Sequence, residues 1–201
     1  MDRWRPTPRQ LATLLAGLWL FGSGEALLLD SQLGNSPWTV LAEGASDQTG
    51  IGVGAATIAI SFVVLAAWIP LRERPGLGTI ANAVVIGLAI GVTAALVPDP
   101  DVLALRVGEV VAGIALVALG SGLYLTTRLG AGPRDGLMLG LHRRTGRSVR
   151  LVRTAIESSA VALGFVLGGT VGLGTLAFAL GIGPGVQAAL GVLSSTPAHE
   201  L

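Results

Sequence analysis

Residues 33–50 read LGNSPWTVLAEGASDQTG, and residues 129–146 read LGAGPRDGLMLGLHRRTG. The two stretches align without a gap at an offset of about 96 residues. The positions that match between them are Leu33/Leu129, Gly34/Gly130, Pro37/Pro133, Leu41/Leu137, Gly44/Gly140, Thr49/Thr145 and Gly50/Gly146. Shorter motifs also recur outside this alignment: GSG at 22–24 and 120–122, and GLGT at 76–79 and 172–175. The chain therefore contains two copies of one unit.

The composition is that of an integral membrane protein. Of 201 residues, 51% are hydrophobic and only 12% are charged, about half the charged share of a soluble domain. There is no cysteine, which excludes disulfides and thiolate metal sites. Six apolar stretches approach the roughly 20 residues that a helix needs to cross a bilayer; they are about 10–29, 51–70, 79–97, 103–126, 151–168 and 174–193.

Three spans in each copy place the second copy upside down relative to the first. We predict an all-α membrane protein of two inverted three-helix repeats, each with a short loop helix. Such inverted repeats are typical of transporters, with the binding site at their interface near the bilayer midplane. The predicted segments are an N-terminal tail (1–9), repeat 1 (10–97), a connecting loop (98–102), repeat 2 (103–193) and a C-terminal tail (194–201).

The positions of the arginines predict the topology independently of hydropathy. With a cytoplasmic N-terminus, twelve of the thirteen basic residues fall on the inner side, and only Arg106 lies near the outer side. This is the asymmetry of the positive-inside rule. Arg3, Arg5 and Arg9 precede a long first apolar stretch, which we interpret as an uncleaved span and not a signal peptide. A five-span variant, which leaves the C-terminal tail outside, stays open.

Each of the two aligned loops is expected to contain a short helix, about 37–47 and about 133–144. Pro37 and Pro133 suit the first position of a helix, and the residues before them, Ser36 and Gly132, are of types that can cap one. One interpretation lays both helices along the membrane surface. The other has them enter from opposite faces with their N-termini aimed inward, where free N–H groups favour an anion.

Charge is not shared between the two loop helices. Arg134 and Asp135 occupy the first turn of the second helix, where Trp38 and Thr39 stand in the first. Asp135 is placed to accept backbone N–H bonds. Arg134 opposes the helix dipole, so we expect it to pair with an acid, a lipid phosphate or a substrate. Trp38 could serve simply as an interfacial anchor.

Ionisable residues within spans are candidates for function, because burying charge in hydrocarbon is costly. Glu25 and Glu109 lie toward the outer side, and Glu157 lies in the fifth stretch. Arg106 could pair with Glu109, and Arg153 with Glu157, at helical spacing. The alternative makes one of these acids a proton carrier. Asn82 is a further polar candidate, either for the site or for a helix–helix hydrogen bond.

No sequence motif argues for catalysis. There is no Walker loop, HExxH, GxSxG or Cys/His cluster, so we predict no catalytic residue, metal or cofactor and no nucleic-acid partner. A basic cytoplasmic surface is expected to contact anionic phospholipids or a protein; its residues are Arg143, Arg144, Arg147, Arg150 and Arg153.

Several segments together resemble the YczE-like bacterial membrane proteins, distant relatives of the YitT group. They are LGNSPW (33–38), WIPLRERPGLGT (68–79), GSGLYL (120–125), LGAGPRDGLMLGL (129–141), RTGRSVRLVRTAIE (144–157) and GGTVGLGTLAFALGIGP (168–184). The resemblance implies a multi-pass protein of the bacterial cytoplasmic (inner) membrane, and it implies no particular activity. Thr39 departs from the family pattern, which has an aspartate there.

Two functions compete at this point. The first is a small secondary transporter or permease of an unidentified solute, which could act as a homodimer. The second is a non-transporting membrane partner that supports a biosynthetic or regulatory complex through the basic cytoplasmic loop. The sequence names neither a solute nor a protein partner.

Overall fold

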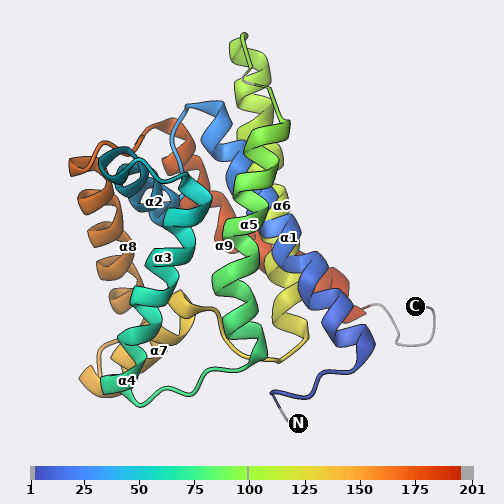
Figure 1. Ribbon diagram of the computed structural model, residues 1–201. Coiled ribbons are helices and arrows are strands. Elements are labelled where there is room, and N and C mark those ends of the chain that lie inside the picture. Colours follow the sequence, from blue (N-terminus) through green and yellow to red (C-terminus); the bar gives the residue numbers. More distant parts are fainter. Residues whose placement is uncertain (1–2, 99, 196–201) are drawn as a thin grey trace.

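The computed structural model describes residues 3–98 and 100–195, and within them the chain is helical and has no strand (Figure 1). The helices of the first half are α1 (Pro8–Ser31), α2 (Pro37–Thr49), α3 (Val53–Ala66), α4 (Trp68–Leu71) and α5 (Leu77–Leu96). Those of the second half are α6 (Leu103–Thr126), α7 (Pro133–Thr145), α8 (Val149–Val166) and α9 (Leu173–Ser195). The two expected loop helices are α2 and α7, and each is a little longer than expected.

Five helical segments of the described part are long and apolar enough to cross a membrane. They are α1, α3 together with α4, α5, α6 and α9. By length and composition alone, the described residues therefore contain five candidate membrane spans and not the six that we expected. The missing one is α8, which has 18 residues but includes Arg150, Arg153 and Glu157.

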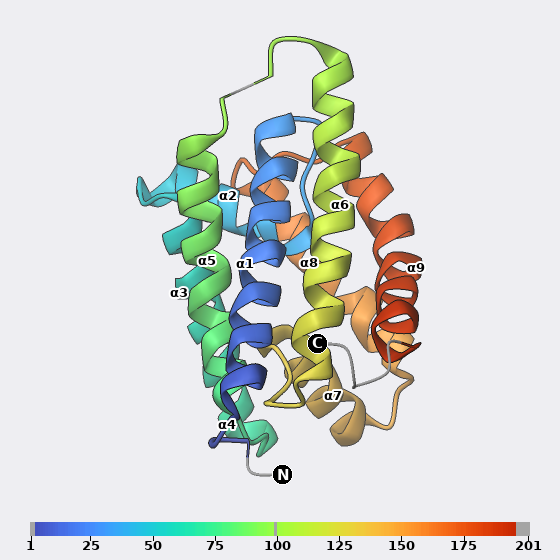
Figure 2. The same cartoon turned by 90° about the vertical axis from the view of Figure 1, so that its right-hand side faces the viewer.

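The centre of the molecule is the crossing of α1 and α6, which run in opposite directions (Figures 1 and 2). Glycines bring their backbones together. A Cβ on Gly24 would lie 2.6 Å from the carbonyl oxygen of Gly113, and one on Gly120 would lie 2.5 Å from that of Gly17. α5 packs on the other side of α1, and α9 packs on α6. The recurring GSG motif thus serves helix packing, as small residues do in membrane bundles.

The other recurring motifs join the two halves through backbone hydrogen bonds. Gly174 N–H donates to the carbonyl of Leu33 at 2.8 Å, and Gly78 N–H donates to the carbonyl of Leu129 at 3.0 Å. Gly34 and Gly130 have φ of 111° and 132°, which glycine adopts without strain. Each LG turn therefore holds the start of the GLGT helix from the opposite half, and this fixes where α2 and α7 begin.

Candidate functional site

The N-terminus of α2 is buried inside the protein. Ser36 caps the helix, since its hydroxyl accepts the Thr39 N–H at 3.4 Å, and Pro37 follows at the first helical position. The same Ser36 hydroxyl donates to Glu25 Oε2 at 2.6 Å, and the Thr39 hydroxyl donates to the same oxygen at 2.7 Å. Glu25 is completely buried, and its other oxygen, Oε1, has no hydrogen-bond partner. A carboxylate of α1 thus anchors the start of α2.

The N-terminus of α7 is anchored by different groups. Its cap residue, Gly132, has no side chain, so no side-chain oxygen satisfies the first N–H groups of the helix. The indole N–H of Trp68 donates to the Pro133 carbonyl at 3.0 Å. Asp135 accepts a hydrogen bond from the Tyr124 hydroxyl at 2.7 Å. The carboxylate therefore ties α7 to α6, and does not cap its own helix as we had expected.

Trp38 and Arg134 bring the two loop helices together. They occupy equivalent positions of the two copies, and the Arg134 guanidinium carbon lies 5.1 Å from the centre of a Trp38 ring. This is within the range of a cation–π contact. A guanidinium stays protonated in proteins, so Arg134 places a fixed positive charge here.

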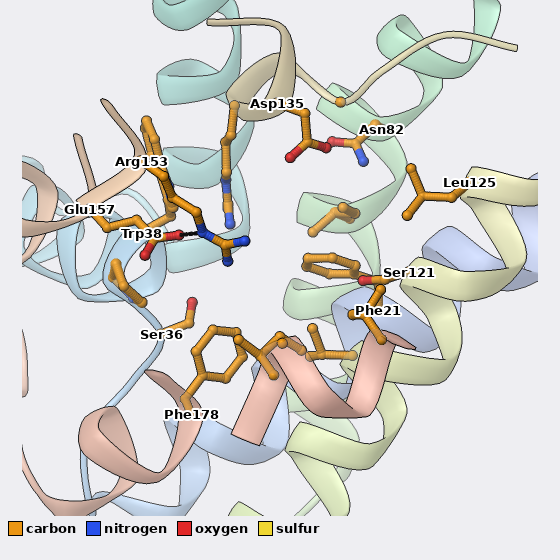
Figure 3. A pocket seen from close by; sticks show the side chains of 18 of the residues that line it. Phe21, Ser36, Trp38, Asn82, Ser121, Leu125, Asp135, Arg153, Glu157 and Phe178 are labelled. Atoms are coloured by element: carbon orange, nitrogen blue, oxygen red, sulfur yellow. Dashed lines mark hydrogen bonds and ion pairs between the residues drawn. The ribbon is translucent and has the colours of Figure 1, made fainter. Parts of the chain in front are cut away.

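A cavity of about 350 Å³ lies between the two N-termini (Figure 3). Its size falls in the range of small-molecule sites. Polar groups from both loop helices line it together with the ion pair of α8, in which Arg153 Nε lies 2.8 Å from Glu157 Oε1. The apolar part of the lining comes mainly from α1, α5, α6 and α9, with Phe21, Ile86, Val117, Phe178, Ile182 and Val186.

The ionisable groups of the cavity differ in how far protein groups engage them. Asp135 is engaged by Tyr124 and Glu157 by Arg153. In residues 3–98 and 100–195 no protein acceptor takes a hydrogen bond from the Arg134 guanidinium, and no three His, Asp or Glu side chains gather to hold a metal. Arg134 thus offers unused donors beside the uncapped N-terminus of α7. Both features attract an anionic group.

The structure brings together most of the residues that the sequence singled out. Ser36, Pro37, Trp38, Asn82, Gly132, Arg134, Asp135 and Glu157 line the cavity. Glu25 lies directly behind Ser36. Asn82 points into the cavity near Asp135 (Figure 3). Glu109 is not part of the lining, and Arg106 donates its Nε–H to the Pro100 carbonyl at 3.1 Å.

The predicted basic surface divides into separate parts. Arg143 forms an ion pair with Glu73, and Arg144 donates to the Pro70 carbonyl at 2.8 Å, so both hold α7 against the segment after α3. Arg153 belongs to the cavity instead. Arg147 and Arg150 are exposed.

Sequence reasoning missed two residues with clear roles. Tyr124, the chain's only tyrosine, lines the cavity and binds Asp135. Because the sequence has a single tyrosine, that residue could have been singled out as a candidate. Glu43 accepts hydrogen bonds from Asn35 Nδ2 at 2.7 Å and from the Thr170 N–H and hydroxyl at 2.6 and 2.8 Å, which joins α2 to the loop before α9. No local pattern marks that contact, because its partners are 127 residues apart.

Comparison with known proteins identifies relatives along nearly the whole chain. A protein of Haemophilus influenzae, described as uncharacterized, is 43% identical over 194 residues, which cover 96% of this chain and 89% of the relative. The uncharacterized membrane protein YczE of Bacillus subtilis is 31% identical over 82% of this chain and 78% of its own length. The uncharacterized protein YyaS of the same organism is 28% identical over 80% of this chain and 82% of its own.

No solved structure matches the chain. The model of a family of unknown function (DUF6198) matches residues 8–190, which include every helix from α1 to most of α9. Together with the relatives, this match confirms the resemblance to the YczE-like proteins that those sequence segments indicated. The chain belongs to this family of YczE-like membrane proteins.

Proposed function

We propose that the protein is a small membrane permease, that its two halves form an inverted repeat crossing the membrane six times, and that the central cavity binds its solute. The observation that carries the proposal is the meeting of two short-helix N-termini, one from each half, at a single cavity lined by ionisable groups. Broken or short helices of this kind form the substrate sites of many transporters, at the interface of their repeats.

The reciprocal contacts of the two halves support the inverted repeat. The hydrogen bond from Gly174 to Leu33 has its counterpart in the one from Gly78 to Leu129. Likewise α1 packs on α5 as α6 packs on α9, and α2 packs on α8 as α7 packs on α3. The equivalent helices α1 and α6 run in opposite directions (Figure 2). In this arrangement α8 is the sixth span. Two of its charged residues, Arg153 and Glu157, pair with each other at the cavity, where the bilayer does not penalise them, and Arg150 is exposed in the first turn of the helix.

The surroundings of the two loops allow their backbone to lie within the membrane. Non-helical backbone within a bilayer is tolerated only where protein buries it or where it lines a cavity. Residues 33–36 and 129–132 meet that condition, because Gly34 and Gly130 pack on the GLGT segments and Ser36 and Gly132 line the cavity. The two loop helices are then re-entrant, and their surface alternative is the weaker one.

The arginines favour an inner membrane location with a cytoplasmic N-terminus. The start of α1, the end of α6 and α7 lie at one end of the molecule (Figure 2). That end includes most arginines, among them Arg3, Arg128, Arg143 and Arg144. The docking alternative has less support, because Arg143 and Arg144 are engaged within the chain.

The function is tested by flux across a membrane. Purified protein in liposomes is screened with organic anions, amino acids and metabolites, and wild type is compared with Arg134→Ala and with Arg147→Ala. Arg147 is exposed and lies outside the cavity lining, so its variant controls for loss of an arginine charge. We expect saturable flux of one class in wild type and in the control, and none in Arg134→Ala. Equal flux in all three, or none beyond empty liposomes, contradicts the proposal.

A further inference from the structure

The two halves of the chain differ in one helix contact. In the first half α3 packs against α5. In the second half the corresponding helices, α8 and α9, both line the cavity, yet they are not among the helix pairs that pack on each other in the described part of the chain. α8 packs instead on α2 and α7, and α9 packs on α6. The two helices of the second half therefore line the cavity without packing closely on each other.

Glycine placement explains the difference. In the α3–α5 contact, a Cβ on Gly54 would lie 2.3 Å from the carbonyl of Gly87, so the backbones touch. The residues at the matching positions, 96 further along, are Arg150 and Gly183. A long charged side chain thus replaces one of the two glycines, and a Cβ added to Gly183 would meet nothing within 4 Å. Close approach of small residues, which joins helices in membranes, is absent there.

Side chains of both helices that line the cavity reach the surface. Arg153 of α8 lines the cavity and is 48% exposed, although it is ion-paired with Glu157. Gln187 of α9 also lines the cavity and is exposed. These two exposed lining residues come from the two helices that do not pack closely on each other, so they point to an opening of the cavity between α8 and α9.

The cavity is also divided chemically. One part presents the Arg134 guanidinium, held on the Trp38 ring, beside the uncapped N-terminus of α7. The opposite part is apolar, with Phe21, Phe178 and Ile182 among its residues. Glu25, Asp135 and Glu157 already accept hydrogen bonds from protein groups. A ligand that satisfies both parts has an anionic head for Arg134 and an apolar body for the α6–α9 side.

We infer that the cavity takes a small amphipathic organic anion, which enters sideways from the bilayer between α8 and α9. This inference rests on the proposed function for the location of the site, but binding and entry are measured without transport. A cavity of about 350 Å³ cannot enclose a whole phospholipid, so the ligand is either a compact molecule or one whose tail projects through the gap.

The ligand class is tested with probes of matched length in lipid nanodiscs by calorimetric titration, with empty nanodiscs subtracted. The probes are octanoate, octyl phosphate, octylammonium and acetate, and the proteins are wild type and Arg134→Gln. We expect octanoate or octyl phosphate to bind wild type, and to bind Arg134→Gln roughly 10- to 100-fold more weakly, as expected for loss of a charged hydrogen-bond donor. Which of the two binds more tightly distinguishes a carboxylate head from a phosphate head. Preference for octylammonium, or equal binding of acetate, overturns the inference.

Entry is tested with Gly183→Phe, which adds bulk where nothing stands within 4 Å of a Cβ. The matched control is Gly91→Phe in α5, whose Cβ also meets nothing but which lies outside the cavity lining. We expect Gly183→Phe to slow association of the probe about tenfold or more, and Gly91→Phe to leave it unchanged. Unchanged association in a folded Gly183→Phe protein overturns sideways entry.

A second measurement keeps the inference testable if the phenylalanine variant does not fold. The chain has no cysteine, so Gly183→Cys has a unique thiol. We expect a lipid-soluble maleimide to label it faster than a membrane-impermeant, water-soluble one, and octanoate to protect it. The reverse order of labelling contradicts entry from the bilayer. Octanoate binding without flux would instead remove the permease function and leave this inference intact.

Discussion

The α3–α5 contact and the α8–α9 gap occupy matching places in the two halves of the chain, yet one is closed and the other open. Gly54 and Gly87 close the first, whereas Arg150 and Gly183 stand in the second. Thr57 and Ser61 of α3 are matched in the same way by Arg153 and Glu157 of α8. A repeated unit can therefore keep its helices while exchanging a packing face for a charged one. The difference teaches that the recurring residues specify the fold, whereas the divergent ones give the proposed site its charges.

The largest effect should come from overfilling the closed contact. Gly87→Leu places side-chain atoms where a Cβ alone would lie 2.5 Å from the Gly54 carbonyl and from Ile58 Cγ1. We expect it to lower the free energy of unfolding by about 3 kcal/mol, or to prevent folding. Gly183→Leu, at the matching position, should change it by less than about 1 kcal/mol, the value for an unconstrained site. Thermal unfolding of both variants in detergent gives the comparison, and equal losses would mean that the two contacts do not differ.

A somewhat smaller effect is expected at the buried anchor of α2. Glu25→Ala leaves the Ser36 and Thr39 hydroxyls without their shared acceptor inside the protein. We expect a loss of about 2–3 kcal/mol, because buried polar groups without partners are costly. Glu25→Gln retains an acceptor oxygen and should recover about half of the loss. Denaturant unfolding in detergent distinguishes them. If alanine and glutamine behave alike, Glu25 does not hold α2 through these hydrogen bonds.

The corresponding anchor of α7 should be weaker. Tyr124→Phe removes the hydroxyl that Asp135 accepts at 2.7 Å, at a place where Asp135 also faces the cavity. Because the freed carboxylate can be hydrated there, we expect a loss of only about 1 kcal/mol. Binding should suffer more than stability, since Asp135 would then be free to compete for Arg134. Unfolding and probe titration of the same preparation test this. A loss as large as that of Glu25→Ala would make the two anchors equivalent.

Much of the architecture could be predicted because it depends on local or repeated signals. Pro37 and Pro133 with their preceding caps located α2 and α7, and apolar length located the long helices. The status of α8 could not be decided from hydropathy, because Arg153 and Glu157 neutralise each other only once the helix has formed. The lack of close packing between α8 and α9 was equally hidden, since it depends on which glycines face each other across the bundle.

Most of the polar residues that line the cavity could be singled out from the sequence, but their arrangement could not. The loop alignment singled out Trp38 and Arg134 as equivalent positions, but only the structure places the guanidinium on the indole ring. The partners of Asp135 and Glu25 depend on how α1 and α6 rotate about their axes. A shift of one residue along either helix would turn Tyr124 or Glu25 away.

The smallest effect on stability should come from the Arg153–Glu157 ion pair, which lies at the α8–α9 gap. Because its removal should hardly change stability, substitutions there report on ligand binding alone. Arg153 is 48% exposed and Glu157 is 31% exposed, at a spacing of four residues. Such exposed helical pairs contribute only about 0.3–0.5 kcal/mol. We therefore expect Arg153→Gln and Glu157→Gln, alone or combined, to leave the unfolding temperature nearly unchanged.

The same substitutions should affect ligand binding in opposite directions. Arg153→Gln frees the negative charge of Glu157 at the cavity and should weaken binding of octanoate, whereas Glu157→Gln leaves Arg153 unpaired and should strengthen it. The double variant should return close to wild type, because both charges are gone. Titration of the four proteins in nanodiscs measures this cycle. If all four bind octanoate alike, charge on α8 does not influence the cavity, and the divergence of α8 from α3 needs an explanation in packing alone.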